Sequence, residues 1–271
     1  MNIGIIQARM GSSRLPGKIL LESCGEPLFS HMLRRIQKSK NLDKIVVATT
    51  TNSQDDIIEK FCKTKKIDFF RGSEHDVLQR YYETAKEFSA NVVVRLTSDT
   101  PLLDAQTIDA VLDVYYNNEF DYVSNQFPFP RTYPDGYNVE VFSFELLQQI
   151  NECAKKPSDR EHVTTFVTMQ PKIFKIFRVD YKKDLSKYRL NLDYESDYQL
   201  IKLIFEGLNP INPYFTLDDI IIWLEQNPDV LKLNENIKPY QNILKSFEED
   251  MKQNFKAYDN NYYLDNFNKQ N

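Results

Sequence analysis

Short apolar runs alternate with helix-like segments through the first half of this chain, and this alternation restricts the fold more than any other feature. The apolar runs are residues 2–8, 44–50, 67–70, 91–96 and 120–124. Most of them are nearly continuous in apolar or β-branched residues, as strands buried in a parallel sheet are. The segments between them have helical periodicity and are residues 27–39, 53–65, 76–89 and 104–118. We therefore predict an α/β fold with a mostly parallel sheet and helices on both faces.

The second half of the chain is less regular. A proline-rich segment, residues 126–137, leads into another predicted strand. Further helices are predicted over residues 143–156, 158–170, 195–208, 217–231 and 239–253, and further strands over 172–180 and 188–193. The pattern changes after Gly207, so we predict one α/β domain over residues 1–207. Residues 208–271 should form a helical extension with a polar tail, and the chain beyond about residue 256 should be dispensable unless it crosses to a partner subunit.

Composition and charge exclude several classes of function. The formal net charge of −5 gives no electrostatic case for binding nucleic acid or an anionic membrane. The sequence has no apolar stretch long enough to span a bilayer, and its first apolar run meets Arg9 too early for a signal peptide. The three cysteines have no metal-binding or disulfide spacing. We therefore expect a cytoplasmic protein with reduced thiols that binds neither nucleic acid nor membranes.

Small, hydroxyl and charged residues follow the predicted strands at the points where they end. They include Ala8, Arg9, Arg71, Gly72, Thr97 and Asp99, with threonines and serines beside them. In open parallel sheets, ligands bind beyond the carboxyl ends of the strands. The sequence therefore predicts a ligand site at this edge, where cations and a carboxylate come together.

The loop after the first strand reads ARMGSSRLPGKIL and carries three cations, Arg9, Arg14 and Lys18. It is not a Walker A loop, because the spacing from Gly11 to Gly17 is one residue too long and no hydroxyl residue follows Lys18. It also lacks the dinucleotide-binding glycine pattern. Three cations beside flexible glycine can nevertheless surround a highly charged anion. We predict a polyphosphate site here, rather than a solvated basic turn.

The same loop strongly resembles the signature loop of the sugar cytidylyltransferases, the enzymes that make CMP-Kdo and CMP-sialic acids. The chain is most similar to the branch that acts in spore-coat polysaccharide biosynthesis. The other matching stretches are FRGSEHDVLQRYYETAK, VVVRLTSDTPLLD, RTYPDGYNVEVFSFE, SDREHVT and RLNLDYESDYQLI. The resemblance covers roughly residues 1–205 and is specific, and the helical part after residue 210 also looks like that branch's extension. It implies a glycosyltransferase-A-like nucleotidyltransferase fold.

The resemblance also implies roles for individual residues. Those expected around the nucleotide are Ala8, Arg9, Gly11, Ser13, Arg14, Lys18, Arg71, Gly72, Asp76, Arg80 and Thr97. Asp99 looks like the first ligand of Mg²⁺ and Asp193 like the second, with Arg9, Lys18 and Asp99 catalytic. Without a ligand, Lys18 should face solvent. Replacing Asp99 or Asp193 by Asn should harm stability little, and relief of charge repulsion could even raise it.

Both carboxylates also have a purely structural interpretation. Asp99 could cap the turn before Pro101, and Asp193 could cap the helix that follows it. Several sialic-acid relatives carry a further carboxylate at the position of Asn191, and a neutral ligand there would weaken a two-metal site. We therefore expect one Mg²⁺ ion rather than two.

A second group of polar residues lies around the proline-rich segment and the DREHVT stretch. Its members are Arg131, Asp135, Glu140, Arg160, His162 and Arg189. Two interpretations stay open, a pocket for the acceptor sugar and the contact face of a homodimer. Arg131, Arg160 and Arg189 are the candidates for binding the carboxylate of an ulosonic acid or the phosphate of a sugar 1-phosphate.

The expected function is therefore that of an Mg²⁺-dependent cytidylyltransferase, which transfers CMP from CTP to a sugar or sugar acid for glycan biosynthesis. A glycosyltransferase of the same fold is one alternative, but such enzymes usually have an Asp-x-Asp pair where TSDTP has a single Asp. A sugar-1-phosphate nucleotidyltransferase is another. A nucleotide-binding protein without activity is a third, and the intact set of Arg9, Lys18, Asp99 and Asp193 argues against it.

Overall fold

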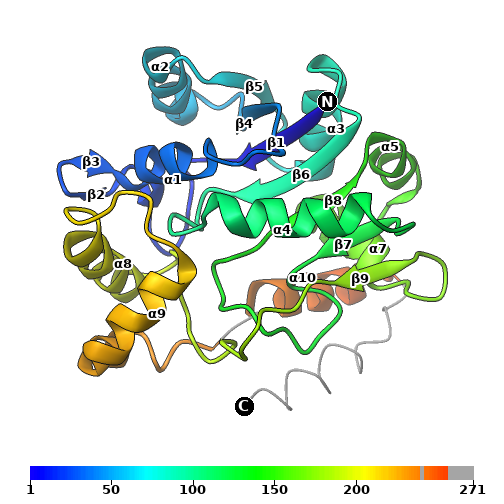
Figure 1. Cartoon of the computed structure of the whole chain (residues 1–271). Coiled ribbons are helices and arrows are strands. Elements are labelled where there is room, and N and C mark those ends of the chain that lie inside the picture. The colour runs from blue at the N-terminus through cyan, green and yellow to red at the C-terminus, as the bar shows by residue number, and fades with distance from the viewer. Residues whose placement is uncertain (239–240, 256–271) are drawn as a thin grey trace.

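A seven-stranded sheet forms the centre of the computed structural model, which describes residues 1–238 and 241–255 (Figure 1). Its strand order is β5-β4-β1-β6-β8-β7-β9. The strands are β1 (Asn2–Gln7), β4 (Lys44–Thr50), β5 (Asp68–Gly72), β6 (Val92–Thr97), β7 (Tyr122–Ser124), β8 (Glu140–Ser143) and β9 (Ile176–Arg178). Only β8 runs antiparallel to its neighbours. The predicted α/β architecture with a mostly parallel sheet is confirmed.

Helices cover both faces of this sheet, as predicted. One face carries α3 (Val77–Glu87), α5 (Phe144–Cys153) and α7 (Thr165–Thr168), with α6 (Pro157–His162) beside α3. The other face carries α1 (Leu28–Ile36), α2 (Asp56–Lys65), α4 (Ala105–Tyr116), α8 (Glu195–Leu208) and α9 (Leu217–Gln226). Successive strand residues point to opposite faces. Ile6 is therefore buried in one core, whereas Ile3 and Ile5 are buried in the other.

The predicted strand over residues 188–193 is wrong. Its side chains do alternate, with Leu190 and Leu192 buried, but its backbone pairs with two different segments. Leu190 N donates to the carbonyl of Asp135 (2.7 Å), whereas Leu192 N donates to the carbonyl of Asp99 (2.9 Å). No continuous ladder can form on two partners. The segment instead ties both loops to the sheet edge.

Other elements differ from the prediction in length. The helix expected over residues 158–170 is interrupted at Val163, so α6 and α7 are separate, and β9 is much shorter than the strand expected over 172–180. A small hairpin, β2 (Glu22–Ser23) and β3 (Glu26–Pro27), was not predicted. Short 3-10 helices are η1 (Lys18–Leu20), η2 (Ser53–Asp55) and η3 (Pro228–Leu233). In the described chain, no helix is both long and apolar enough to cross a membrane.

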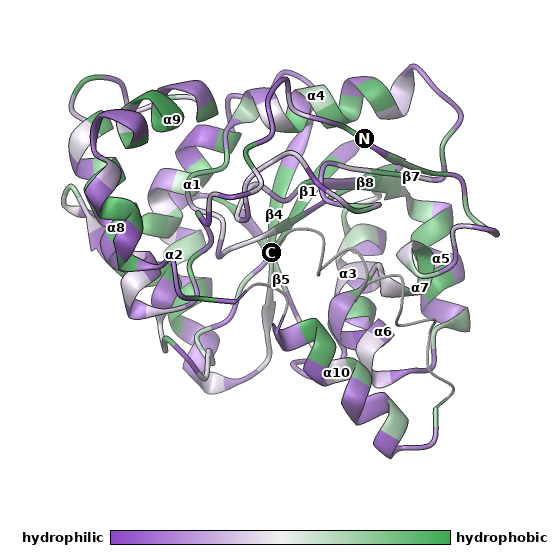
Figure 2. Cartoon of the chain, turned by 90° about the horizontal axis from the view of Figure 1, so that it is seen from below, coloured by the Kyte–Doolittle hydropathy of each residue, from purple (hydrophilic) through white to green (hydrophobic). Residues whose placement is uncertain are grey.

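Within the described residues, the extension after Gly207 adds two α-helices with different surroundings. α9 belongs to the core that includes α8, where Ile220 and Leu224 are fully buried. The last described helix, α10 (Gln241–Lys252), instead returns to α6 on the other side of the molecule (Figures 1 and 2). The domain boundary at residue 207 remains a prediction, and the buried core continues across it. The expectation for the tail beyond residue 256 lies outside the described residues.

We expect Gly207→Ala to destabilise the protein, although alanine is normally the better helix residue. A Cβ at this position would lie 2.4 Å from Nε1 of Trp223 and 2.7 Å from its Cε2. Overpacking against a rigid ring costs about 1–3 kcal/mol, measurable by urea unfolding. The double variant with Trp223→Leu serves as the control and should recover part of the loss. Equal stability of wild type and Gly207→Ala would contradict this packing.

Candidate active site

A cavity of about 640 Å³ opens beyond the carboxyl ends of β1 and β6. This volume lies within the range of pockets that hold nucleotide-sized ligands. Most of the predicted site residues line it: Ala8, Arg9, Ser13, Arg14, Lys18, Arg80, Thr97, Asp99, Arg131, Asp135, Glu140, His162, Arg189 and Asp193. The expected position of the site, at the strand ends of an open parallel sheet, therefore agrees with the geometry.

The loop after β1 is held in shape by a buried carboxylate. Asp55, fully buried, accepts a hydrogen bond from Met10 N (2.7 Å) and another from the Thr50 hydroxyl. Gly17 has φ 68°, a left-handed conformation that glycine adopts without steric cost, and its N–H closes the loop onto the carbonyl of Met10 (3.1 Å). The side chain of Arg9 is 44% exposed at the rim. The loop therefore presents its cations from a fixed backbone.

Lys18 lies at the centre of the site and is not solvent-facing, contrary to expectation. Its side chain is 11% exposed, and its ammonium contacts Asp99 Oδ2 (3.1 Å) and Asp193 Oδ1 (2.9 Å). It also donates to the backbone carbonyl of Leu192 (2.7 Å). The prediction failed because it considered the loop alone, whereas in the fold two distant carboxylates converge on this ammonium.

The charges of this cluster stabilise one another. Burial disfavours the charged form of Lys18, but the carboxylates of Asp99 and Asp193 outweigh it and the pKa of Lys18 is raised. Burial would likewise raise the pKa of Asp193, but Lys18 and Arg14 outweigh it and lower that pKa to about 2. Arg14 Nη2 lies 2.7 Å from Asp193 Oδ1. Asp99 and Asp193 are both paired with Lys18, so replacing either by Asn should not stabilise the fold. The expectation that relief of charge repulsion could raise stability is therefore corrected.

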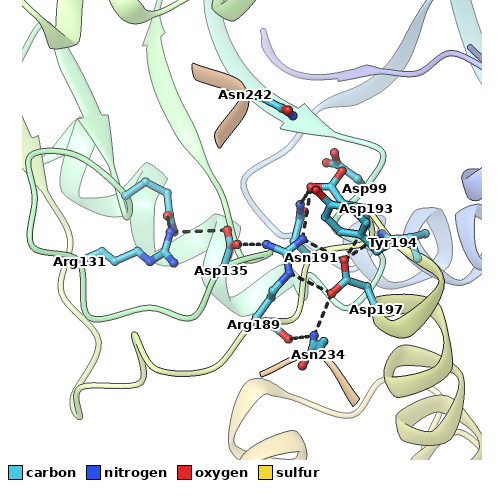
Figure 3. A network of polar contacts seen from close by, with 12 residues as sticks. Asp99, Arg131, Asp135, Arg189, Asn191, Asp193, Tyr194, Asp197, Asn234 and Asn242 are labelled. Carbon is cyan, nitrogen blue, oxygen red and sulfur yellow. Dashed lines mark hydrogen bonds and ion pairs between the residues drawn. The ribbon is translucent and has the colours of Figure 1, made fainter. Parts of the chain in front are cut away.

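A second cation, the guanidinium of Arg189, helps to orient Asp193 (Figure 3). Arg189 contacts three carboxylates: Asp135 (2.9 Å), Asp197 (2.9 Å) and Asp193 (3.4 Å). Asp197 Oδ2 also accepts the backbone N–H groups of Asp193 and Tyr194, both at 3.0 Å, at the start of α8. The Asn191 amide donates to Asp193 Oδ2 (2.8 Å). Oδ1 of Asp193 is thereby directed to Lys18 and Arg14.

Asp99 and Asp193 both contact one cation, the ammonium of Lys18. Their oxygens nearest to the ammonium of Lys18 can be no more than about 6 Å apart, since each contacts the same nitrogen, so a small shift would let both contact one ion. The Lys18 ammonium thus acts as a stand-in cation among three oxygens. Among the described residues there is no group of three or more His, Cys, Asp or Glu side chains placed for a metal. Further ligands would have to come from the nucleotide.

Five predicted residues do not line the cavity, namely Gly11, Arg71, Gly72, Asp76 and Arg160. The Arg71 guanidinium is held over α2 by Asp56 and Glu59, both at 2.7 Å. Asp76 caps α3 and pairs with Arg160 Nη2 (2.6 Å), which ties α3 to α6. The ion pairs of these residues therefore serve the scaffold in the described structure, and their predicted contacts with ligands stay predictions.

An ion pair in the cavity lining was not predicted from the sequence. Arg95 on β6 pairs with Glu140 on β8, which faces it across the antiparallel ladder. Glu140 Oε2 also accepts from the hydroxyls of Tyr122 (2.8 Å) and Thr164 (2.5 Å), and Arg95 Nη2 donates to Gln7 Oε1 (3.2 Å). The available signal was an arginine inside an apolar strand, opposite a glutamate that needed a partner.

Some buried polar atoms that line the cavity near Arg131 are unsatisfied in the described structure. Arg131 Nη1 donates to Gln126 Oε1 (3.0 Å) and lies 3.5 Å from Asp135 Oδ1. Gln126 is 4% exposed, and its Nε2 has no hydrogen-bond partner in the described structure. The same is true of Asn138 Oδ1. Buried polar atoms of this kind normally find a partner, and here a ligand could supply it.

The family model for "Cytidylyltransferase" matches residues 3–252 of this chain. The chain belongs to the cytidylyltransferase family. It is therefore a nucleotidyltransferase, as the resemblance implied. A solved cytidylyltransferase from Leptospira borgpetersenii superposes with a TM-score of 0.81 at 34% identity, over 89% of this chain and 99% of that one. A CMP-Kdo synthetase complexed with CTP gives a TM-score of 0.57 at 17% identity, over 76% and 98% of the two chains, which supports the fold.

Sequence relatives place this cytidylyltransferase in the expected branch. It is 31% identical to the spore coat polysaccharide biosynthesis protein SpsF of Bacillus subtilis, over 83% of this chain and 94% of that protein. It is 37% identical to the protein MJ1063 of Methanocaldococcus jannaschii, over 87% and 95% of the two chains. A 3-deoxy-manno-octulosonate cytidylyltransferase of Chlorobium chlorochromatii is 31% identical, but over only 42% of this chain.

Replacing Lys18 by Met should destabilise this cytidylyltransferase by about 2 kcal/mol, because two partly buried carboxylates lose their shared cation. Mg²⁺ should restore part of that loss in the variant by binding between them, and raise its Tm more than that of the wild type. Arg9→Met is the matched control, since Arg9 does not contact either carboxylate in the structure. A Tm of Lys18→Met that is indifferent to Mg²⁺ both without and with CTP would contradict the shared cation position.

The free energy of unfolding should depend on Asp193 in acid. The folded-state pKa of about 2 lies below the ordinary value near 3.9, so the stabilisation by Asp193 is complete above about pH 4. It is lost as the pH falls through 2. Wild type should exceed Asp193→Asn by about 2 kcal/mol at pH 6, and the gap should close between pH 4 and pH 2. Urea unfolding measures it, with the exposed Asp229→Asn as control. A gap that is constant with pH would refute the shift.

Proposed function

We propose that this protein transfers CMP from CTP to a sugar acid and releases pyrophosphate, in the biosynthesis of a surface polysaccharide or glycan. The observation that supports this most is the convergence of Asp99 and Asp193 on one cationic position beside the loop with Arg9, Arg14 and Lys18. A triphosphate and a divalent ion need this combination of charges. The polysaccharide role follows the name of the SpsF relative.

The nucleotide would lie with its triphosphate over the loop after β1. Arg9, Arg14 and Lys18 would bind the phosphate oxygens and retain the departing pyrophosphate. Mg²⁺ would be held by Asp99 and Asp193, where the Lys18 ammonium lies in the described structure, and when bound it supplies charge neutralisation at the phosphates. Lys18 would then give up its carboxylate partners and contact phosphate. The main contribution of the chain is to position the reactants and to balance their charge.

The acceptor would bind at the opposite end of the cavity, between β8 and the proline-rich segment. Of the three arginines considered for a carboxylate, Arg160 is paired outside the cavity and Arg189 is shared by three aspartates. Arg131, which lines the cavity beside the unsatisfied amide of Gln126, is the best placed. An ulosonic acid fits this donor set, because a carboxylate can accept from a guanidinium and an amide together. A homodimer contact at these residues remains a separate prediction.

A pyrophosphate-release assay tests the reaction directly. With Mg²⁺ and CTP, an ulosonic acid should give turnover, whereas nucleotide sugars should not be consumed. Asp99→Asn should lower kcat by orders of magnitude and raise the Mg²⁺ requirement, because half of the protein's carboxylate ligands for the ion are lost. Consumption of a nucleotide sugar in place of a triphosphate would support the glycosyltransferase alternative. Turnover with a sugar 1-phosphate alone would retain the nucleotidyl transfer and change the acceptor.

Nucleotide choice is tested by thermal shift in the presence of Mg²⁺. CTP at one hundred times its Kd should raise Tm by about 5 °C, because a ligand that binds only the folded state stabilises it. ATP, GTP and UTP at the same concentration should raise Tm less. This preference rests on the family and not on a base-reading side chain. A larger shift with another triphosphate would remove the cytidylyl part of the proposal.

A further inference from the structure

Val163 has a backbone conformation that side chains rarely adopt. Its φ is 67° and its ψ is −57°, and the N–H of Thr164 donates to the carbonyl of His162 at 2.7 Å. These angles and this hydrogen bond define a γ-turn of the strained type. A β-branched residue is especially unfavourable at positive φ. Val163 is nevertheless fully buried, so the surrounding structure must hold it there.

The γ-turn presents both of its flanking side chains to the cavity. Thr164, on one side, donates to Glu140 Oε2 (2.5 Å), and His162 lines the cavity on the other side. A continuous helix through residues 158–170 would direct these side chains about 100° apart per residue around its axis. The break at Val163 therefore determines which groups face the acceptor end. Strained backbone of this kind concentrates at functional sites.

α10 holds the helix that leads into this turn at both of its ends. At the start of α6, Asp250 accepts from Ser158 N (3.0 Å) and from the Ser158 hydroxyl (2.5 Å). At its end, the Ser246 hydroxyl lies 2.9 Å from His162 Nε2 and 3.2 Å from Glu161 Oε2. Ser246 is itself buried. The last turn of α6, where the strain begins, is thus fastened to the C-terminal extension.

We propose that Ser246 is a positioning residue, which holds the γ-turn through His162 and so fixes Thr164 and His162 at the acceptor end of the cavity. The effect of this residue on the acceptor rests on the proposed function. A neutral hydroxyl suits the role, because it orients the imidazole without adding charge to a cavity that must admit an anionic sugar. The Michaelis constant for the acceptor should therefore depend on Ser246 more strongly than the constant for CTP, to whose site α10 is linked through Asn242 and Arg14.

Hydrogen exchange tests the mechanical link in the full-length protein without any ligand. In Ser246→Ala, the amides of residues 162–168 should exchange about three- to ten-fold faster than in the wild type, the change expected for one lost neutral hydrogen bond. Ser246→Thr keeps the hydroxyl and should restore protection. Glu248→Ala, an exposed position on the same helix, is the matched control and should match the wild type. Equal exchange in Ser246→Ala and Glu248→Ala would overturn the proposal.

Steady-state kinetics with Mg²⁺, CTP and Kdo as the probe acceptor provide the second measurement. Ser246→Ala should raise KM for Kdo about three- to ten-fold and leave KM for CTP within about two-fold of the wild type. Ser246→Thr should restore KM for Kdo. Equal increases in both constants, or no change in either, would overturn the positioning role. If the wild type turns over neither Kdo nor the other acceptors of the pyrophosphate-release assay, the proposed function fails. Hydrogen exchange alone then decides whether Ser246 holds the turn.

Discussion

One ammonium group joins parts of the chain that are far apart in sequence. Lys18 brings together the loop after β1, Asp99 after β6, and the Leu192–Asp193 segment before α8. Taking three charges out of water is costly unless each is closely paired, so this contact forms only when all three segments are in place. The backbone follows the same pattern, since Leu192 N donates to the carbonyl of Asp99. The position of α8 and the shape of the cavity both depend on this point.

The features predicted correctly from the sequence are those that local hydrophobic pattern determines. The alternation of apolar runs predicted the parallel sheet, and the strand ends predicted the edge at which the cavity beside Arg9 and Asp99 opens. The prediction failed where distant segments interact. The exposure of Lys18 depended on Asp193, whose position is set by Arg189 and Asp197. Likewise, residues 188–193 (YRLNLD) alternate between apolar and polar side chains as a strand does. Whether they join the sheet depends on the backbone N–H and C=O groups of the neighbouring segments, which the sequence does not place.

Some residues could have been found from the sequence and others could not. Arg95 breaks an apolar strand, and this irregularity already indicated a buried partner such as Glu140. Ser246 and Asn242 carry no such signal, because polar residues are ordinary on a surface helix. Their places in the cavity wall follow from where α10 docks, through Phe247 against Phe129 and through contacts with α6. Docking of this kind is a tertiary property that helical periodicity does not encode.

The contribution of α10 to the cavity wall has a consequence for how the protein folds during its synthesis. Asn242, which accepts from Arg14, and Ser246 lie close to the end of the described chain and are synthesised after every strand of the sheet. Domains generally fold from the N-terminus during synthesis, at about 5–20 residues per second. A nascent chain can thus complete its sheet and its cationic loop on the ribosome while one wall of the cavity is still missing. A chain that ends before α10 would therefore retain the charged cluster of Lys18, Asp99 and Asp193 and lack the wall that Asn242 and Ser246 form.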